Sequence, residues 1–125
     1  MKFFYFLNLI ILLFGFINCD GDTNNKISYA FDVRPIFVNT CFSCHSDPEH
    51  SSNNLNLISY KTMMYDTSDN GPVIIPKYPE QSIIVDKMLN EQPAFGSQMP
   101  LDLMPLEYDQ INKIQRWIYH GAKDN

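Results

Sequence analysis

The pentapeptide at residues 41–45 constrains this chain more than any other feature. It reads Cys41-Phe42-Ser43-Cys44-His45, so two thiols lie three positions apart and an imidazole follows directly. With three Cys and three His among 125 residues, chance would produce this pattern somewhere in the chain with a probability of about 0.002. C-x-x-C-H is the spacing at which two thiols in one helical turn add across the vinyl groups of a haem while the histidine ligates iron. The pentapeptide therefore predicts one covalently attached haem c, with Cys41 and Cys44 as attachment residues and His45 as an axial ligand.

The first 18 residues have the pattern of a secretory signal peptide. Lys2 precedes an apolar run over residues 3–17 that is interrupted only by one Asn and one Gly. The run is too short to span a membrane comfortably, and its charge and length are typical of a signal sequence. We therefore expect a signal peptide at residues 1–18 and an exported protein.

Cys19 stands where a small-residue cleavage site would otherwise be expected. Residues 16–19 resemble the lipobox of bacterial lipoproteins, although Phe16 and Asn18 fit that pattern loosely. The two haem cysteines leave Cys19 as an odd thiol in an exported protein, which favours its lipidation. We expect a lipidated cysteine and polar tether over 19–26, which anchors a domain over 27–125 to the periplasmic or cell-surface side of a bacterial membrane. A plain cleaved signal or an uncleaved anchor is the alternative.

The charge of the mature chain argues against a role in nucleic-acid binding. Without residues 1–18 the chain has 107 residues, with eight Lys and Arg against fourteen Asp and Glu, a formal charge of −6. An acidic surface repels phosphate backbones and favours solubility or a basic protein partner. A chain of this length forms one small domain whose apolar core is marginal alone, and a haem would add to that core.

Hydrophobic spacing predicts a few short helices, separated by long loops, and shows no alternating strand pattern. The clearest helix covers about residues 106–120, with four apolar side chains on one face and Gly121 at its end. Three shorter helices are predicted at 33–42 with Asp32 as N-cap, at 59–65, and at 83–89 with Ser82 as N-cap. The fold class is therefore all-α.

Several segments in this order resemble class I cytochrome c domains, and more narrowly the planctomycete-type cytochrome c domains. The residues that carry the resemblance are Asp32 to Phe37, Cys41 to His45, Leu55-Asn56-Leu57, Pro76 to Ser82, Met99-Pro100 and Trp117 to Ala122. The resemblance implies a small cytochrome c fold wrapped around one haem, with Phe37 and Trp117 as an aromatic pair where the N- and C-terminal helices cross. Family members commonly carry glycine in place of Lys77, which allows a different loop backbone here.

Met99 is the best candidate for the axial ligand opposite His45. It lies in an irregular segment, precedes a proline that restricts its backbone, and is far enough along the chain to reach around a haem. Met104, which also precedes a proline, His120 or an empty position are the alternatives. We expect His50 to be too close to His45 to oppose it, and Met63, Met64 and Met88 to fill the core.

The leading functional hypothesis is a lipid-anchored mono-haem cytochrome c that exchanges electrons with redox proteins and is not an enzyme. Ligation by His and Met closes the iron to other ligands, which favours electron transfer. One alternative is a haem enzyme or gas sensor with a displaceable ligand. The other is a haem-free thiol or metal module built on Cys41, Cys44 and His45, for which His50 would be the nearest fourth zinc ligand.

Overall fold

The computed structural model describes residues 26–47, 49, 52–65 and 68–125, so the expected signal peptide, Cys19 and nearly all of the tether lie outside the described residues. The described α-helices are α2 (Arg34–Thr40), α3 (Phe42–His45), α4 (Tyr60–Tyr65), α5 (Ile83–Leu89) and α6 (Tyr108–Tyr119). The shorter helical turns are the π-helical η2 (Tyr29–Val33) and the 3₁₀ turns η3 (Ser52–Asn54) and η4 (Pro79–Gln81). Within these ranges no strand forms, apart from an isolated bridge between Ser68 and Gly71. The all-α prediction is confirmed.

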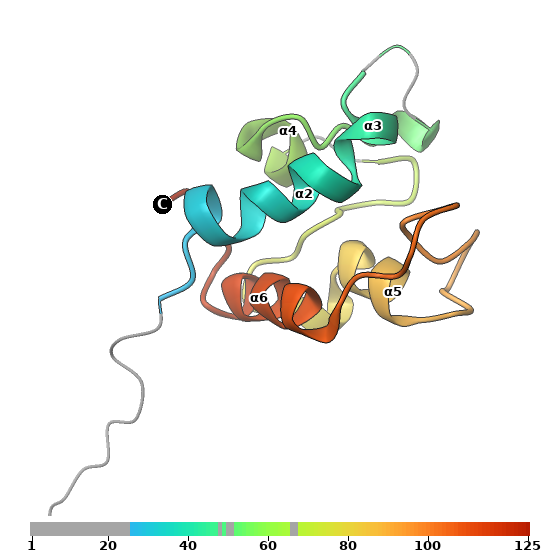
Figure 1. Cartoon of the computed structure of the whole chain (residues 1–125). Helices are drawn as coiled ribbons and strands as arrows, with labels where there is room; N and C mark the ends of the chain where they lie inside the picture. The colour runs from blue at the N-terminus through green and yellow to red at the C-terminus, as the bar shows by residue number, and fades with distance from the viewer. Residues whose placement is uncertain (1–25, 48, 50–51, 66–67) are drawn as a thin grey trace, which may run out of the picture.

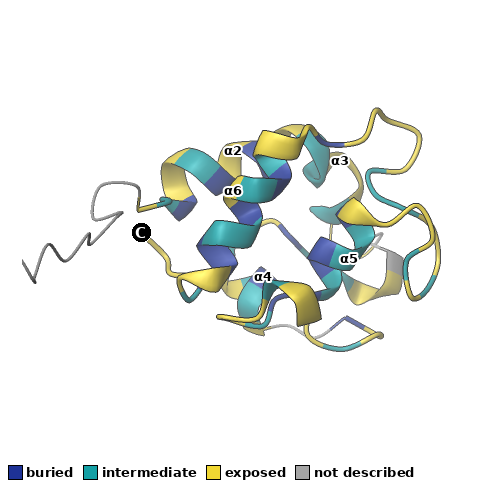
Figure 2. Cartoon of the chain, turned by 90° about the horizontal axis from the view of Figure 1, so that it is seen from below, coloured by how far each residue is buried: buried dark blue, intermediate teal, exposed yellow. Residues whose placement is uncertain are grey.

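The helices form two groups that face each other. In Figure 1, α2, α3 and α4 lie on one side and α5 and α6 on the other, and the chain that leads from α4 to α5 runs between them. The buried residues of α2, α5 and α6 occupy one face of each helix, and α3 has none (Figure 2). One apolar core therefore lies between the two groups, and the one-turn helix α3 lies at its border.

The N-terminal helix begins earlier than the sequence predicted, and Asp32 is not its N-cap. Ser28 is the N-cap of η2, and its hydroxyl accepts a hydrogen bond from the Phe31 N–H at 3.3 Å. The Asp32 carboxylate accepts one from the Ser28 N–H at 2.8 Å. These two bonds form a reciprocal cap, which normally joins residues three apart. Here the π-turn inserts one extra residue, so Asp32 follows Ser28 by four positions. The usual three-residue spacing of a capping box is therefore absent from the sequence, and the sequence did not reveal this cap.

Helix α6 confirms the clearest sequence prediction. Its four buried residues are those that the spacing selected, namely Ile111, Ile114, Trp117 and Ile118. A capping box starts the helix, because the Gln110 side chain accepts the N–H of Glu107 at 2.9 Å while the Glu107 side chain caps Gln110. Gly121 follows the helix with φ of +100°, a conformation that glycine adopts without strain. The cap and the glycine explain why the helix begins and ends where it does.

Trp117 fixes α6 against the N-terminal segment through aromatic contacts. Its ring stacks on Tyr29 at 5.3 Å between centroids, and Tyr60 meets both rings edge-on at 5.2 and 6.4 Å. Its indole N–H donates to the Lys123 carbonyl at 2.8 Å. Phe37 is fully buried in the same core, but the ring contacts of Trp117 are with the two tyrosines.

The last residue joins the first described segment. Asn125 accepts the Tyr29 N–H on its side-chain oxygen at 2.9 Å, and its carbonyl accepts the Ala30 N–H at 2.9 Å and the Ser28 hydroxyl at 2.8 Å. Figure 1 shows the C-terminus beside the start of the described chain. The two ends of the domain therefore lie side by side.

Candidate functional site

The pentapeptide consists of Cys41, which separates α2 from α3, and the four residues of α3. The Cys41 N–H donates to the Phe37 carbonyl at 2.8 Å, which ends α2, and the Cys41 carbonyl accepts the N–H groups of Cys44 at 3.2 Å and His45 at 3.0 Å. One helical turn thus gathers both thiols and the imidazole. Cys41 is half-buried and Cys44 is exposed, and both are free thiols.

Burial favours the protonated form of the Cys41 thiol. The Thr40 hydroxyl donates to the Ile36 carbonyl at 2.7 Å, and its oxygen lies 3.3 Å from the Cys41 sulfur. Burial raises the pKa of the Cys41 thiol, and the Thr40 contact opposes that shift only in part. A thioredoxin-type cysteine needs a lowered pKa to act as a nucleophile. The geometry therefore gives no support to the thiol-exchange alternative.

His45 presents a neutral imidazole to the interior. Burial lowers its pKa, and the Leu55 backbone beside the ring opposes the shift without giving Nδ1 a hydrogen bond of normal geometry. Nδ1 is buried and has no hydrogen-bond partner among the residues that the structure describes. The main chain of His45 is fixed, because its carbonyl accepts the Leu57 N–H at 2.8 Å. A neutral imidazole is the form in which histidine binds a metal.

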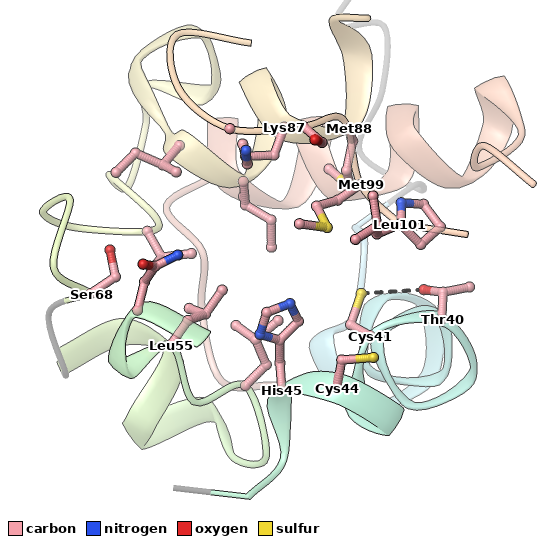
Figure 3. Close-up of a pocket in the computed structure, with 18 of the residues that line it drawn as sticks. Thr40, Cys41, Cys44, His45, Leu55, Ser68, Lys87, Met88, Met99 and Leu101 are labelled. Carbon is pink, nitrogen blue, oxygen red and sulfur yellow. Dashed lines mark hydrogen bonds between the residues drawn. The ribbon is translucent and has the colours of Figure 1, made fainter. Parts of the chain in front are cut away.

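A cavity of about 300 Å³ lies between α3 and α5 and receives these groups (Figure 3). Apolar side chains make up most of its wall, among them Leu55, Leu57, Val73, Ile83, Ile84, Met88, Phe95, Leu101, Leu103 and Leu106. Cys41 and Cys44 lie at one edge, and Ser68 lies at the opposite edge (Figure 3). Apart from Cys41, Cys44 and His45, Lys87 is the only residue with an ionisable side chain among the described residues that line the cavity. An apolar cavity with a few polar groups at its edges is suited to an amphipathic prosthetic group.

Met99 lies across the cavity from His45, with its sulfur turned toward the imidazole (Figure 3). Its N–H donates to the Lys87 carbonyl at 2.7 Å, and the neighbouring Gln98 side chain donates to the Met88 carbonyl at 3.1 Å. The Met99-Pro100 peptide bond is cis. Two hydrogen bonds to α5 therefore hold the irregular segment that brings Met99 to the cavity.

The other candidate ligands lie elsewhere, with one exception. Met104 is 85% exposed, and neither it nor His120, which is exposed at the end of α6, lines the cavity. Met63 is buried away from the cavity and Met64 packs against the core. Met88 is buried too, but it also lines the cavity. His50 lies outside the described residues.

The residues present fit a haem c. Two thiols lie at one edge, an imidazole with an unpartnered buried nitrogen lies on one face, and a thioether lies on the other. Among the described side chains, no group of three or more His, Cys, Asp or Glu gathers as a metal site of its own. The donor set therefore matches iron held within a porphyrin, because each axial side needs only one protein ligand.

The comparisons with known proteins agree with this geometry. Residues 41–101, about half of the chain, match the family model of planctomycete cytochrome C. No curated protein and no solved structure gives a significant match. The fold and the site define a protein of the c-type cytochrome class. More narrowly, the chain contains a planctomycete-type cytochrome c domain, so the narrower resemblance seen in the sequence is confirmed over residues 41–101.

Membership of this class implies covalently bound haem c, and electron transfer rather than catalysis. Cytochrome c domains are typically exported. Within the part of the chain that the structure describes, no helix has the length and apolar character needed to cross a membrane.

Three features of the site were missed in the sequence. Thr40, Lys87 and the polar edge with Ser68 carry no motif, and only the folded chain brings them to the cavity. Thr40 precedes the first cysteine directly, so its position next to the thiol was the one signal available. Lys87 lies twelve residues before Met99 on a helix whose spacing indicated only a buried face.

Proposed function

We propose that this protein is a mono-haem cytochrome c that carries one electron at a time between redox proteins outside the cytoplasm. We propose also that a lipid on Cys19 attaches it to a bacterial membrane on the periplasmic or cell-surface side. The observation that supports electron transfer best is the placement of His45 and Met99 on opposite sides of an apolar cavity, with Cys41 and Cys44 at its edge. The sequence contains a single C-x-x-C-H, which supports one haem.

Haem c would supply a one-electron redox centre that alternates between ferric and ferrous iron. Cys41 and Cys44 would hold it through thioether bonds, and His45 and Met99 would take the two axial positions. A Met ligand opposite His raises the reduction potential, and two protein ligands leave no position for a substrate. The apolar wall would exclude water and so keep the reorganisation of the surroundings small on electron transfer. These properties suit a carrier rather than a catalyst.

The test is an absorption spectrum of the exported holoprotein in both oxidation states, with the wild type beside Met99→Ala and the control Met104→Ala. We expect covalently bound haem in all three, and loss of the methionine-ligation signature only in Met99→Ala. Met104 is the matched control because it also precedes a proline but points to solvent. The reduction potential of Met99→Ala should fall.

Three outcomes would contradict the proposal. Unchanged spectra in Met99→Ala would remove Met99 from the iron. Peroxide turnover by a high-spin ferric wild type would favour the enzyme or sensor alternative. A mass spectrum with free thiols at Cys41 and Cys44 after export in a haem-attaching host would favour the haem-free module.

A further inference from the structure

Lys87 contacts both ends of the short segment that brings Met99 to the cavity. From α5, its backbone carbonyl accepts the Met99 N–H at 2.7 Å. Its side-chain ammonium donates to the Phe95 carbonyl at 2.6 Å and lies 4.9 Å from the centroid of the Phe95 ring. One residue therefore ties segment 95–99 to α5 at its beginning and at its end.

The segment leaves room for the ammonium group. Gly96 has φ of +60°, and a Cβ atom built there would lie 3.1 Å from Lys87 Nζ. That distance is shorter than ordinary van der Waals contact, so any larger residue would press on the ammonium. The absence of a side chain at Gly96 is thus matched to the position of Lys87.

The surroundings make the ammonium contact strong. Lys87 is half-buried, and no carboxylate is among the described residues that line the cavity. A hydrogen bond from a charged donor is stronger than a neutral one, and a cation over an aromatic face gains more when water is partly excluded. The Phe95 carbonyl and ring are therefore the groups that stabilise this charge on the cavity side.

We propose that Lys87 is a positioning residue that clamps segment 95–99 to α5 and so keeps Met99 over the cavity. Without the clamp, the segment opens more often and Met99 leaves its place opposite His45. This inference rests on the proposed function, because it assigns the control of a ligand that the proposed function assumes. It goes beyond that function, because it predicts that replacing Lys87, which does not bind the iron, changes how often Met99 occupies the position opposite His45.

The test uses Lys87→Met in the holoprotein, which keeps the length of the side chain and removes the charged donor. Carbon monoxide binds ferrous haem where the sixth position is open, so its affinity reports how often Met99 is displaced. The loss of a charged hydrogen bond corresponds to roughly a ten- to hundredfold change in the closing equilibrium. We therefore expect Lys87→Met to bind carbon monoxide at least about tenfold more tightly than the wild type, with a lower reduction potential.

Two controls separate the clamp from charge and from stability. Lys113→Met makes the same chemical change at an exposed position of α6. Ile114→Val lowers stability from a fully buried position on α6. Both should bind carbon monoxide as the wild type does, and far-ultraviolet circular dichroism should show that all variants are folded.

Equal carbon monoxide affinity in Lys87→Met, Lys113→Met and wild type would overturn the clamp. If Lys87→Met does not yield folded holoprotein, Lys87→Gln decides, because its shorter, neutral side chain also removes the charged donor from the Phe95 carbonyl. Tighter binding in Lys87→Gln supports the clamp, and unchanged binding overturns it. Met99→Ala separates the two proposals: if it changes neither spectrum nor affinity, the proposed ligation fails, whereas a change in Met99→Ala alone means that only the clamp fails.

Discussion

Lys77 shows how one residue can keep a backbone conformation that its side chain disfavours. Its φ is +74°, in the left-handed region that glycine adopts freely. Because lysine replaces the glycine that is common here in the resembling family, the sequence allowed a loop backbone that differs from the family's. The structure nevertheless has the conformation that glycine would adopt. The Lys77 N–H donates to the Ile118 carbonyl at 2.8 Å, so the turn is held to the end of α6. The hydrogen bond compensates for strain in the backbone.

Lys77→Gly should therefore stabilise the protein. It removes a left-handed strain of about 1–2 kcal/mol, and glycine costs about 0.4–1 kcal/mol through the freedom of the unfolded chain. We expect the free energy of unfolding to rise by about 0.5–1 kcal/mol, measured by chemical denaturation of the holoprotein. Lys77→Ala is the control, because alanine keeps the Cβ strain and should give no such gain. A fall in stability of Lys77→Gly would show that the exposed lysine side chain contributes more than its backbone costs.

At the scale of elements, the start of α5 depends on a serine that acts differently from its predicted role. Ser82 occupies the N-cap position, as the sequence indicated, but its hydroxyl makes no cap hydrogen bond. Instead it accepts the Ile75 N–H at 2.9 Å and donates to the Tyr78 carbonyl at 2.9 Å, and the residue is only 1% exposed. It therefore joins α5 to the loop before η4.

Ser82→Ala should weaken this junction. The change leaves the Ile75 N–H without its acceptor inside the protein, which costs about 1–2 kcal/mol of unfolding free energy. The control is Ser97→Ala, the same change at an exposed serine. Denaturation midpoints of the two variants provide the measurement. Equal midpoints would mean that water replaces the hydroxyl at Ile75.

At the scale of the whole molecule, the proposed lipid decides where the protein is found. Cys19→Ser removes the only thiol that the lipobox-like sequence offers for acylation. We expect the wild type to incorporate labelled palmitate and to sediment with membranes, and the Cys19→Ser variant to do neither. The haem spectrum is the internal control, because the change lies outside residues 41–101. Membrane association of the variant without a label would favour an uncleaved N-terminal anchor instead.

Local features could be predicted from the sequence, and features made by distant segments could not. Helix α6 was predictable because its apolar spacing is regular over three turns and Gly121 marks its end. The pentapeptide predicted its own geometry because it lies within one helical turn. The predicted start of the N-terminal helix was wrong, because the π-turn moves the acidic partner of the N-cap serine by one residue. Lys87 was missed because its partner carbonyl, on Phe95, reaches it only after the chain turns back over α5.

The pairing of Asn125 with Tyr29 has a consequence for how the molecule meets its surroundings. The start of the described chain and the C-terminus lie at one end of the domain, and Figures 1 and 2 place α3 and α5, which border the cavity, toward the other end. If the proposed lipid anchors the protein through its N-terminal segment, the end of the domain that carries the cavity would face away from the membrane. Docking by a soluble redox partner would then not compete with the bilayer for the same surface.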